Sequence, residues 1–134
     1  MKRAIFVAMI GISLFASQNI YGYDEERAIA NLASDFAECS AYYIIAAEAL
    51  RRIAKEDLAQ KALEVSDRAY AYAIKFSNPK VTAARVRLAF DRQRKEMDHD
   101  FSNFSILILK YGEMCRDVLE SPEERLEYWL EKKD

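Results

Sequence analysis

The chain has 134 residues, of which 51% are hydrophobic and 31% are charged. This is the composition of a one-domain globular protein, and it excludes intrinsically disordered, collagen-like and low-complexity classes. A single histidine also excludes metal or acid–base sites that require several imidazoles.

Residues 1–22 have the order of segments found in a secretory signal peptide. Lys2 and Arg3 give a positively charged start, and residues 4–16 form an uncharged apolar run. A helix of this length spans about 20 Å, whereas the hydrocarbon core of a membrane is about 30 Å thick. We therefore favour a cleaved signal over a membrane anchor and predict cleavage after Gly22. The mature protein would be exported to a bacterial periplasm or to the medium.

Residues 23–134 are predicted to form a single domain with no stable membrane insertion after the signal is removed. No second apolar run in the sequence approaches the 18 residues that indicate a spanning helix. Loss of Lys2 and Arg3 leaves 18 basic and 22 acidic residues, a net charge of −4. This charge argues against nucleic acid or an anionic membrane surface as the partner.

The spacing of apolar residues predicts helices throughout this domain. Gly112, Pro79 and Pro122 are the only glycine and prolines after residue 22, too few for the turns of a β-rich fold. Spacings of three and four residues, typical of a buried helical stripe, recur in two segments at about residues 25–53 and 56–77. The first stripe comprises Ile29, Leu32, Phe36, Cys39, Tyr43, Ala46, Leu50 and Ile53, and the second comprises Leu58, Ala62, Val65, Ala69, Tyr72 and Phe76.

Two proline-containing sequences indicate where later helices begin. Asn78 or Ser77 can cap a helix that starts at Pro79. The sequence from Ser121 to Glu124, with Pro122 between them, predicts a capping box and a last helix over residues 122–132. A third stripe, interrupted near Gln93, comprises Val86, Phe90, Met97, Phe101, Phe104, Ile108, Tyr111 and Cys115.

Cys39 and Cys115 are predicted to form a disulfide, because both lie on apolar stripes and export leads to an oxidising compartment. An unbroken third helix over residues 79–119 would place Cys115 about 40 Å from Cys39, whereas a disulfide allows about 4–7 Å between Cα atoms. A chain reversal near residues 98–102 would bring the two cysteines level.

We therefore predict an all-α fold: an up-down-up-down helical bundle with a short C-terminal helix, stapled by one disulfide. The alternative is one long third helix, with Cys115 bonded to another subunit or left reduced.

Two short patterns resemble motifs that carry chemistry. Glu96 and His99 have the E-x-x-H spacing that places two metal ligands on one helical face, but di-iron bundles need two such motifs. Residues 91–100 are also polar nearly all round, so we expect a solvated turn or helix face. Ser77 and Lys80 fit an S-x-x-K pattern, yet a helix start explains them and the companion motifs are missing. We predict no catalytic residue, metal or cofactor.

The remaining candidates fit structural roles. Arg85 and Arg92 project from one side of the third helix and Arg87 and Arg94 from the other, so we expect them to flank its buried stripe rather than bind an anion. Glu48 lies away from the main stripe and is expected at an edge. Five tyrosines at helical spacing are expected to be core residues rather than an aromatic cleft. These are Tyr42, Tyr43, Tyr70, Tyr72 and Tyr111.

No nucleophile–base pair, metal cluster or glycine loop points to an enzyme. The sequence favours an exported, non-catalytic protein that binds an unidentified protein, such as an inhibitor, immunity or accessory factor, and that is a monomer or weak homo-oligomer. Tyr128, Trp129 and Leu130 are consecutive, so at least one must face outward and could contact the partner, although Trp129 could instead pack its own helix. One alternative is a stress chaperone that exposes apolar helix faces at low pH or on reduction. A more remote one is a hydrolase using Glu48 or the Glu96–His99 pair.

Overall fold

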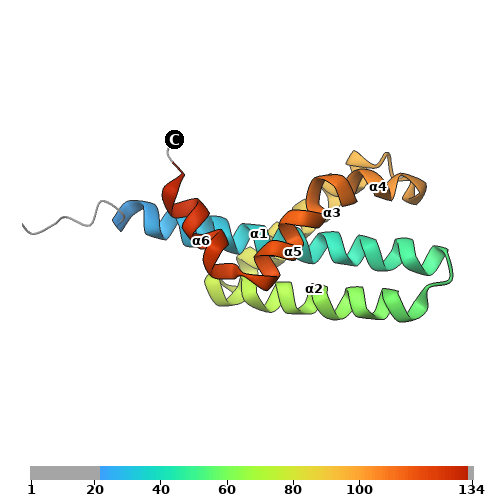
Figure 1. Ribbon diagram of the computed structural model, residues 1–134, viewed down its shortest axis with the longest axis horizontal. Coiled ribbons are helices and arrows are strands. Elements are labelled where there is room, and N and C mark those ends of the chain that lie inside the picture. The colour runs from blue at the N-terminus through green and yellow to red at the C-terminus, as the bar shows by residue number, and fades with distance from the viewer. Residues whose placement is uncertain (1–21, 133–134) are drawn as a thin grey trace, which may run out of the picture.

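A computed structural model describes residues 22–132, and this part of the chain is helical, with no β-strand (Figure 1). The predicted signal peptide lies outside these residues, except for Gly22, which begins the first helix. The elements are α1 (Gly22–Arg52), α2 (Glu56–Phe76), α3 (Pro79–Glu96), the 3-10 turn η1 (Phe101–Asn103), α4 (Phe104–Leu107), the π-helical turn η2 (Ile108–Gly112), α5 (Glu113–Glu120) and α6 (Pro122–Glu131).

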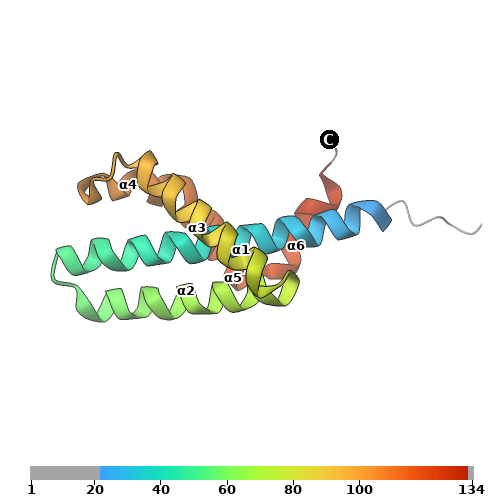
Figure 2. The same ribbon diagram turned by 180° about the vertical axis from the view of Figure 1, so that it is seen from behind.

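Helix α1 is the centre of the bundle. It runs antiparallel to α2, with α5 and α6 in front of it in Figure 1 and α3 crossing it in the reverse view of Figure 2. The all-α up-down-up-down prediction is confirmed. No helix within residues 22–132 is long and apolar enough to cross a membrane.

The predicted chain reversal follows α3. This helix ends at Glu96, and Asp98 and His99 then adopt positive φ angles of 54° and 57°, a left-handed conformation that these residue types tolerate better than most. The chain returns through η1, α4 and η2 into α5, which places the Cα of Cys115 5.3 Å from that of Cys39 in an intramolecular disulfide. The alternative of one long helix over residues 79–119 is therefore excluded.

The contact between α1 and α2 is made by small side chains, which corrects the second predicted stripe. The buried residues of α2 are Ala59, Ala62, Ser66, Ala69 and Ala73. Small side chains allow two helices to approach closely, and the Ser66 hydroxyl reaches the Ser40 carbonyl oxygen at 2.8 Å. The bulkier residues of the predicted stripe are displaced to the flanks.

Three residues of the predicted stripes are wrongly predicted as core, and one of them is Ile108 of the third stripe, which is 49% exposed on η2. Leu58 is 49% exposed on a flank of α2, and Ile53 is 64% exposed because α1 ends one residue before it. Other flank residues do pack: the ring of Phe36 on α1 stacks on Tyr72 and Phe76 at centroid distances of 4.9 and 6.0 Å. The tyrosine prediction is confirmed, with Tyr42 and Tyr111 buried and the other three half-buried against the core.

The two predicted caps have different outcomes. The Asn78 side chain accepts a hydrogen bond of 2.9 Å from the Val81 amide and caps α3 as predicted. The capping box at Ser121 is wrong, because the Ser121 side chain makes no capping hydrogen bond. With φ −138° and ψ 70°, Ser121 departs from the extended conformation in which a hydroxyl faces the first helical amides.

The disulfide closes a loop between residues 76 apart in the sequence, and we expect it to dominate the stability of the fold. The double variant Cys39→Ala/Cys115→Ala should lose about 4.5 kcal/mol of unfolding free energy, the chain-entropy value for such a loop. Urea unfolding followed by circular dichroism measures this loss. A double variant as stable as the parent, or a parent that migrates as a disulfide-linked dimer without reductant, would contradict the expectation.

Candidate functional site

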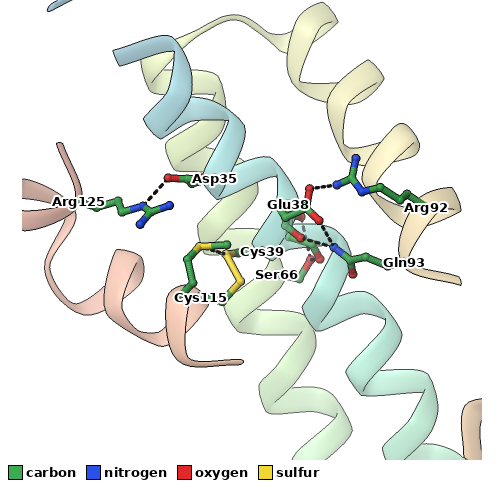
Figure 3. Close-up of a disulfide and its surroundings, with 10 residues drawn as sticks. Asp35, Glu38, Cys39, Ser66, Arg92, Gln93, Cys115 and Arg125 are labelled. Carbon is green, nitrogen blue, oxygen red and sulfur yellow. Dashed lines mark hydrogen bonds and ion pairs between the residues drawn. A yellow bond between two sulfur atoms is a disulfide. The ribbon is translucent and has the colours of Figure 1, made fainter. Parts of the chain in front are cut away.

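Four side chains in the central segment of α1 (residues 35–40) attach α1 to four other helices (Figure 3). Asp35 contacts α6, Glu38 contacts α3, Cys39 is bonded to α5, and Ser40 is hydrogen-bonded to Ser66 of α2. These six residues span about one and a half helical turns, at about 3.6 residues per turn, so their side chains leave α1 in different directions.

Asp35 anchors the C-terminal helix. Its Oδ2 atom accepts hydrogen bonds from the Arg125 Nε and Trp129 Nε1 atoms, both at 2.7 Å. Asp35 is buried, and the Arg125 side chain is only 23% exposed, so this ion pair lies largely out of water. Hydrogen bonds to a charged group in such surroundings are among the stronger ones in proteins. The position of α6 therefore depends on one carboxylate of α1.

Helix α6 carries two aromatic rings with cations beside them. Tyr128 and Trp129 pack edge to face at a centroid distance of 5.1 Å. The Arg125 guanidinium lies 4.4 Å from the Tyr128 ring centre, and the Lys132 ammonium lies 4.8 Å from that of Trp129. Both distances fall within the range of cation–π attraction. We call these four residues the α6 surface.

The three predicted partner-contact residues have different environments. Tyr128 is 46% exposed and faces outward. Trp129 is half-buried and packs α6 against the core, and Leu130 is half-buried as well. The structure thus gives Trp129 the packing role that the sequence allowed, and it leaves Tyr128 as the accessible side chain.

Glu38 joins α1 to α3. Its carboxylate pairs with Arg92 and accepts a hydrogen bond of 2.9 Å from the amide of Gln93, which also donates to the Glu38 carbonyl oxygen at 3.0 Å. The ion pair with Glu38 raises the pKa of Arg92. Gln93 is completely buried. The expectation that residues 91–100 form a solvated turn or face is therefore wrong at Gln93, whose amide nitrogen donates hydrogen bonds to Glu38. Met97 is core, as its place on the third stripe predicted.

Glu96 joins α3 to the returning chain. It accepts hydrogen bonds from the Tyr111 hydroxyl at 2.9 Å and from the Lys110 ammonium at 2.7 Å, and both residues are carried by η2. Burial, together with the hydrogen bond to Glu96, raises the pKa of Tyr111. The neighbouring Glu96 carboxylate also raises the pKa of Lys110.

The structure does not bring Glu96 and His99 together as a ligand pair. Helix α3 has ended before the exposed, left-handed His99, so the two side chains do not share a helical face. Among residues 22–132 no group of three or more His, Cys, Asp or Glu side chains could hold a metal ion. The carboxylates of Glu38 and Glu96 both accept hydrogen bonds from side chains of the protein. This arrangement fits a role in holding the helices together.

The other predicted residues take the structural positions expected for them. Ser77 ends α2, and Lys80 lies exposed in the first turn of α3. The Arg94 guanidinium lies 5.7 Å from the Phe90 ring, Arg87 is exposed, and Glu48 pairs with Arg52 at 3.3 Å on the surface. The predicted edge position of Glu48 is confirmed, and the four arginines lie on the flanks of the buried face of α3, as predicted.

One open cavity was missed by the sequence analysis. It has a volume of about 420 Å³ and lies where the first turns of α1, the end of α2 and the middle of α3 meet. Its lining residues are Glu25, Glu26, Ile29, Ala30, Phe76, Ser77 and Arg85. Since three segments distant in sequence form it, no local pattern could have indicated it. Asp35 and Glu38 were also missed, although each is an acid next to a residue of the predicted core stripe.

Comparison with known proteins gives no match to a family model, to a curated protein or to a solved structure.

We expect Asp35→Ala to destabilise the protein by about 2–3 kcal/mol, because the Trp129 indole N–H and the Arg125 guanidinium lose a largely buried acceptor. Urea unfolding measures the loss, and the fluorescence of Trp129, the only tryptophan, should shift to the red as α6 loosens. Asp117→Ala is the matched control, since its pair with Arg116 is more than half exposed. Equal unfolding midpoints for the two variants would contradict the anchoring role of Asp35.

Alkaline destabilisation should report on Tyr42. Burial, and secondarily the neighbouring Tyr43, raises the pKa of Tyr42 from 10.0 to about 12. The folded protein therefore holds this proton more tightly than the unfolded chain, so the stabilisation is complete below pH 10 and is lost as the pH rises toward 12. Tyr42→Phe should make the fall in unfolding free energy across this window shallower.

Urea titrations at several pH values measure this slope for the parent, for Tyr42→Phe and for the control Tyr128→Phe at an exposed position. An unchanged slope in Tyr42→Phe would refute the assignment.

Proposed function

We propose that this is an exported, non-catalytic protein that acts by binding another protein through the α6 surface. The observation that carries the proposal is the exposed Tyr128 ring, which lies beside Trp129 and close to two cations on a helix that is itself fixed by Asp35. An inhibitor, immunity or accessory factor would fit this description.

The composition of the α6 surface supports protein binding. Tyrosine, tryptophan and arginine are the residue types that most often dominate the energy of protein interfaces. The Trp129–Asp35 hydrogen bond and the edge-to-face ring pair hold the side chains in one arrangement before binding. A surface held in this way loses less conformational entropy when a partner docks.

The polar clusters of the protein support a non-catalytic role. The carboxylates of Asp35, Glu38 and Glu96 all accept hydrogen bonds from side chains of other helices. A general acid or base has to be available to a substrate, whereas these groups are engaged in holding helices together. Export is supported by the signal-peptide pattern of residues 1–22 and by the disulfide, since structural disulfides persist in oxidising compartments.

The test is affinity capture with the exported protein as bait. Its mass should show a start at Tyr23, and extracts of the source cells should yield one stoichiometric partner. Tyr128→Ala should weaken binding of the purified partner at least about tenfold, the loss expected at an interface hot spot. Leu109→Ala is the control because it truncates a still more exposed apolar side chain, 88% accessible, on η2.

Trp129→Ala is unsuitable for this test, because losing the bond to Asp35 would detach α6 as well as alter the surface. Equal partner affinity for the parent and Tyr128→Ala would contradict the proposal. So would a failure to recover any partner, or turnover in a substrate panel.

A second candidate, a stress chaperone, is favoured by the exposed apolar side chains of Ile106, Ile108 and Leu109 on α4 and η2. Such side chains could hold unfolded clients, and more of the apolar stripes would be exposed at low pH or on reduction. Suppressed aggregation of a client at acid pH, together with increased binding of the dye ANS and loss of both effects in Leu109→Asn, would favour this candidate over the first.

A further inference from the structure

The cavity at the start of α1 has walls of opposite charge. Figure 2 shows α3 running from the end of α2 across α1, and the cavity lies near this crossing. Glu25 and Glu26 line it from the first turns of α1, and Arg85 lines it from α3. The α6 surface contains none of these residues, so the cavity is independent of the proposed function.

These three charged side chains are not neutralised by one another. Neither Glu25 nor Glu26 forms an ion pair within the described residues, and Arg85 has no carboxylate partner there. Toward residues 22–132 the Arg85 guanidinium donates one hydrogen bond, of 3.5 Å, to the Ala30 carbonyl oxygen, which is at the long limit for such a bond. A guanidinium has five N–H donors, so Arg85 retains donors for a ligand.

The remaining lining is largely apolar. Ile29, Ala30 and Phe76 provide it, and the Phe76 ring is fixed by stacking on Phe36 and Tyr72 at 6.0 and 6.5 Å. The C-terminal end of α2 at Phe76 and Ser77 adds the partial negative charge of a helix C-terminus, which favours a cation. A volume of about 420 Å³ lies within the range typical of small-molecule sites, about 300–1,000 Å³.

We propose that this cavity binds a small apolar zwitterion, an amino acid or short peptide with an apolar side chain. Arg85 would bind the carboxylate, Glu25 and Glu26 the ammonium group, and Phe76 and Ile29 the apolar body. A ligand with a single charge would pair with the wall of opposite charge but would partly desolvate the wall of its own charge without pairing it, which is unfavourable. A zwitterion satisfies both walls.

Calorimetric titration of the purified protein with the dipeptide Leu-Phe and with free phenylalanine tests this proposal. At least one zwitterion should bind saturably and at least tenfold more tightly than both of its singly charged analogues, the C-terminal amide and the N-acetyl derivative. Arg85→Gln should abolish the preference over the amide. Glu25→Gln/Glu26→Gln should abolish the preference over the acetylated form.

Each variant has a matched control. Arg87→Gln changes an exposed arginine of the same helix, and Glu123→Gln/Glu124→Gln changes two exposed acids in the first turn of α6. Both controls should keep the affinity of the parent. The Glu25/Glu26 pair is exposed, so that variant remains informative if Arg85→Gln fails to fold. Lack of saturable binding of both zwitterions, equal affinity for the singly charged analogues, or equal losses in the control variants would overturn the proposal.

Discussion

The Cys39–Cys115 bond joins α1 to the part of the chain that returns after α3, and the other helix contacts are arranged around it. Cys39, its half on α1, is preceded in sequence by Glu38, which contacts α3 (Figure 3), and followed by Ser40, which contacts α2. Asp35, one turn earlier, contacts α6. Because the loop between the cysteines includes α2 and α3, the bond restricts the unfolded chain over most of the domain.

Polar contacts matter here because small side chains make the contact between the two longest helices, α1 and α2. The α1–α2 contact is built largely from alanine and serine, which bury little apolar area per residue. Carboxylates taken out of water are costly, and pairs of this kind are often neutral for stability. Their geometry nevertheless restricts the arrangement: Glu38 meets Gln93 at one register of α3, and Asp35 meets Trp129 at one position of α6. We infer that these contacts select one register of α3 and one position of α6, whereas small apolar residues alone would allow several arrangements of similar energy.

The sequence was sufficient for the helices, their approximate ends and the cysteine pairing, because each depends on local spacing or on the reach of a disulfide. It also placed the reversal near residues 98–102, although Phe101 and Phe104 continue the helical spacing of apolar residues through it. The spacing of large apolar residues did not predict the buried face of α2. That face consists of alanine and serine, because α1 packs too close to it to leave room for leucine. The contacts of Asp35 with Arg125 and Trp129 join residues 90 and 94 apart, and only the fold brings them together.

The dependence of α6 on Asp35 connects the fold to the proposed function. A helix of 10 residues is too short to be stable alone in water, where about 12–15 residues are already marginal. The arrangement of Tyr128 and Trp129 therefore exists only while α6 is docked on α1. Since Asp35 lies one turn from Cys39, that docking site is held by the same part of α1 that the disulfide fixes. A partner that binds the α6 surface would thus recognise the folded, oxidised protein and would not recognise an isolated peptide with the sequence of α6.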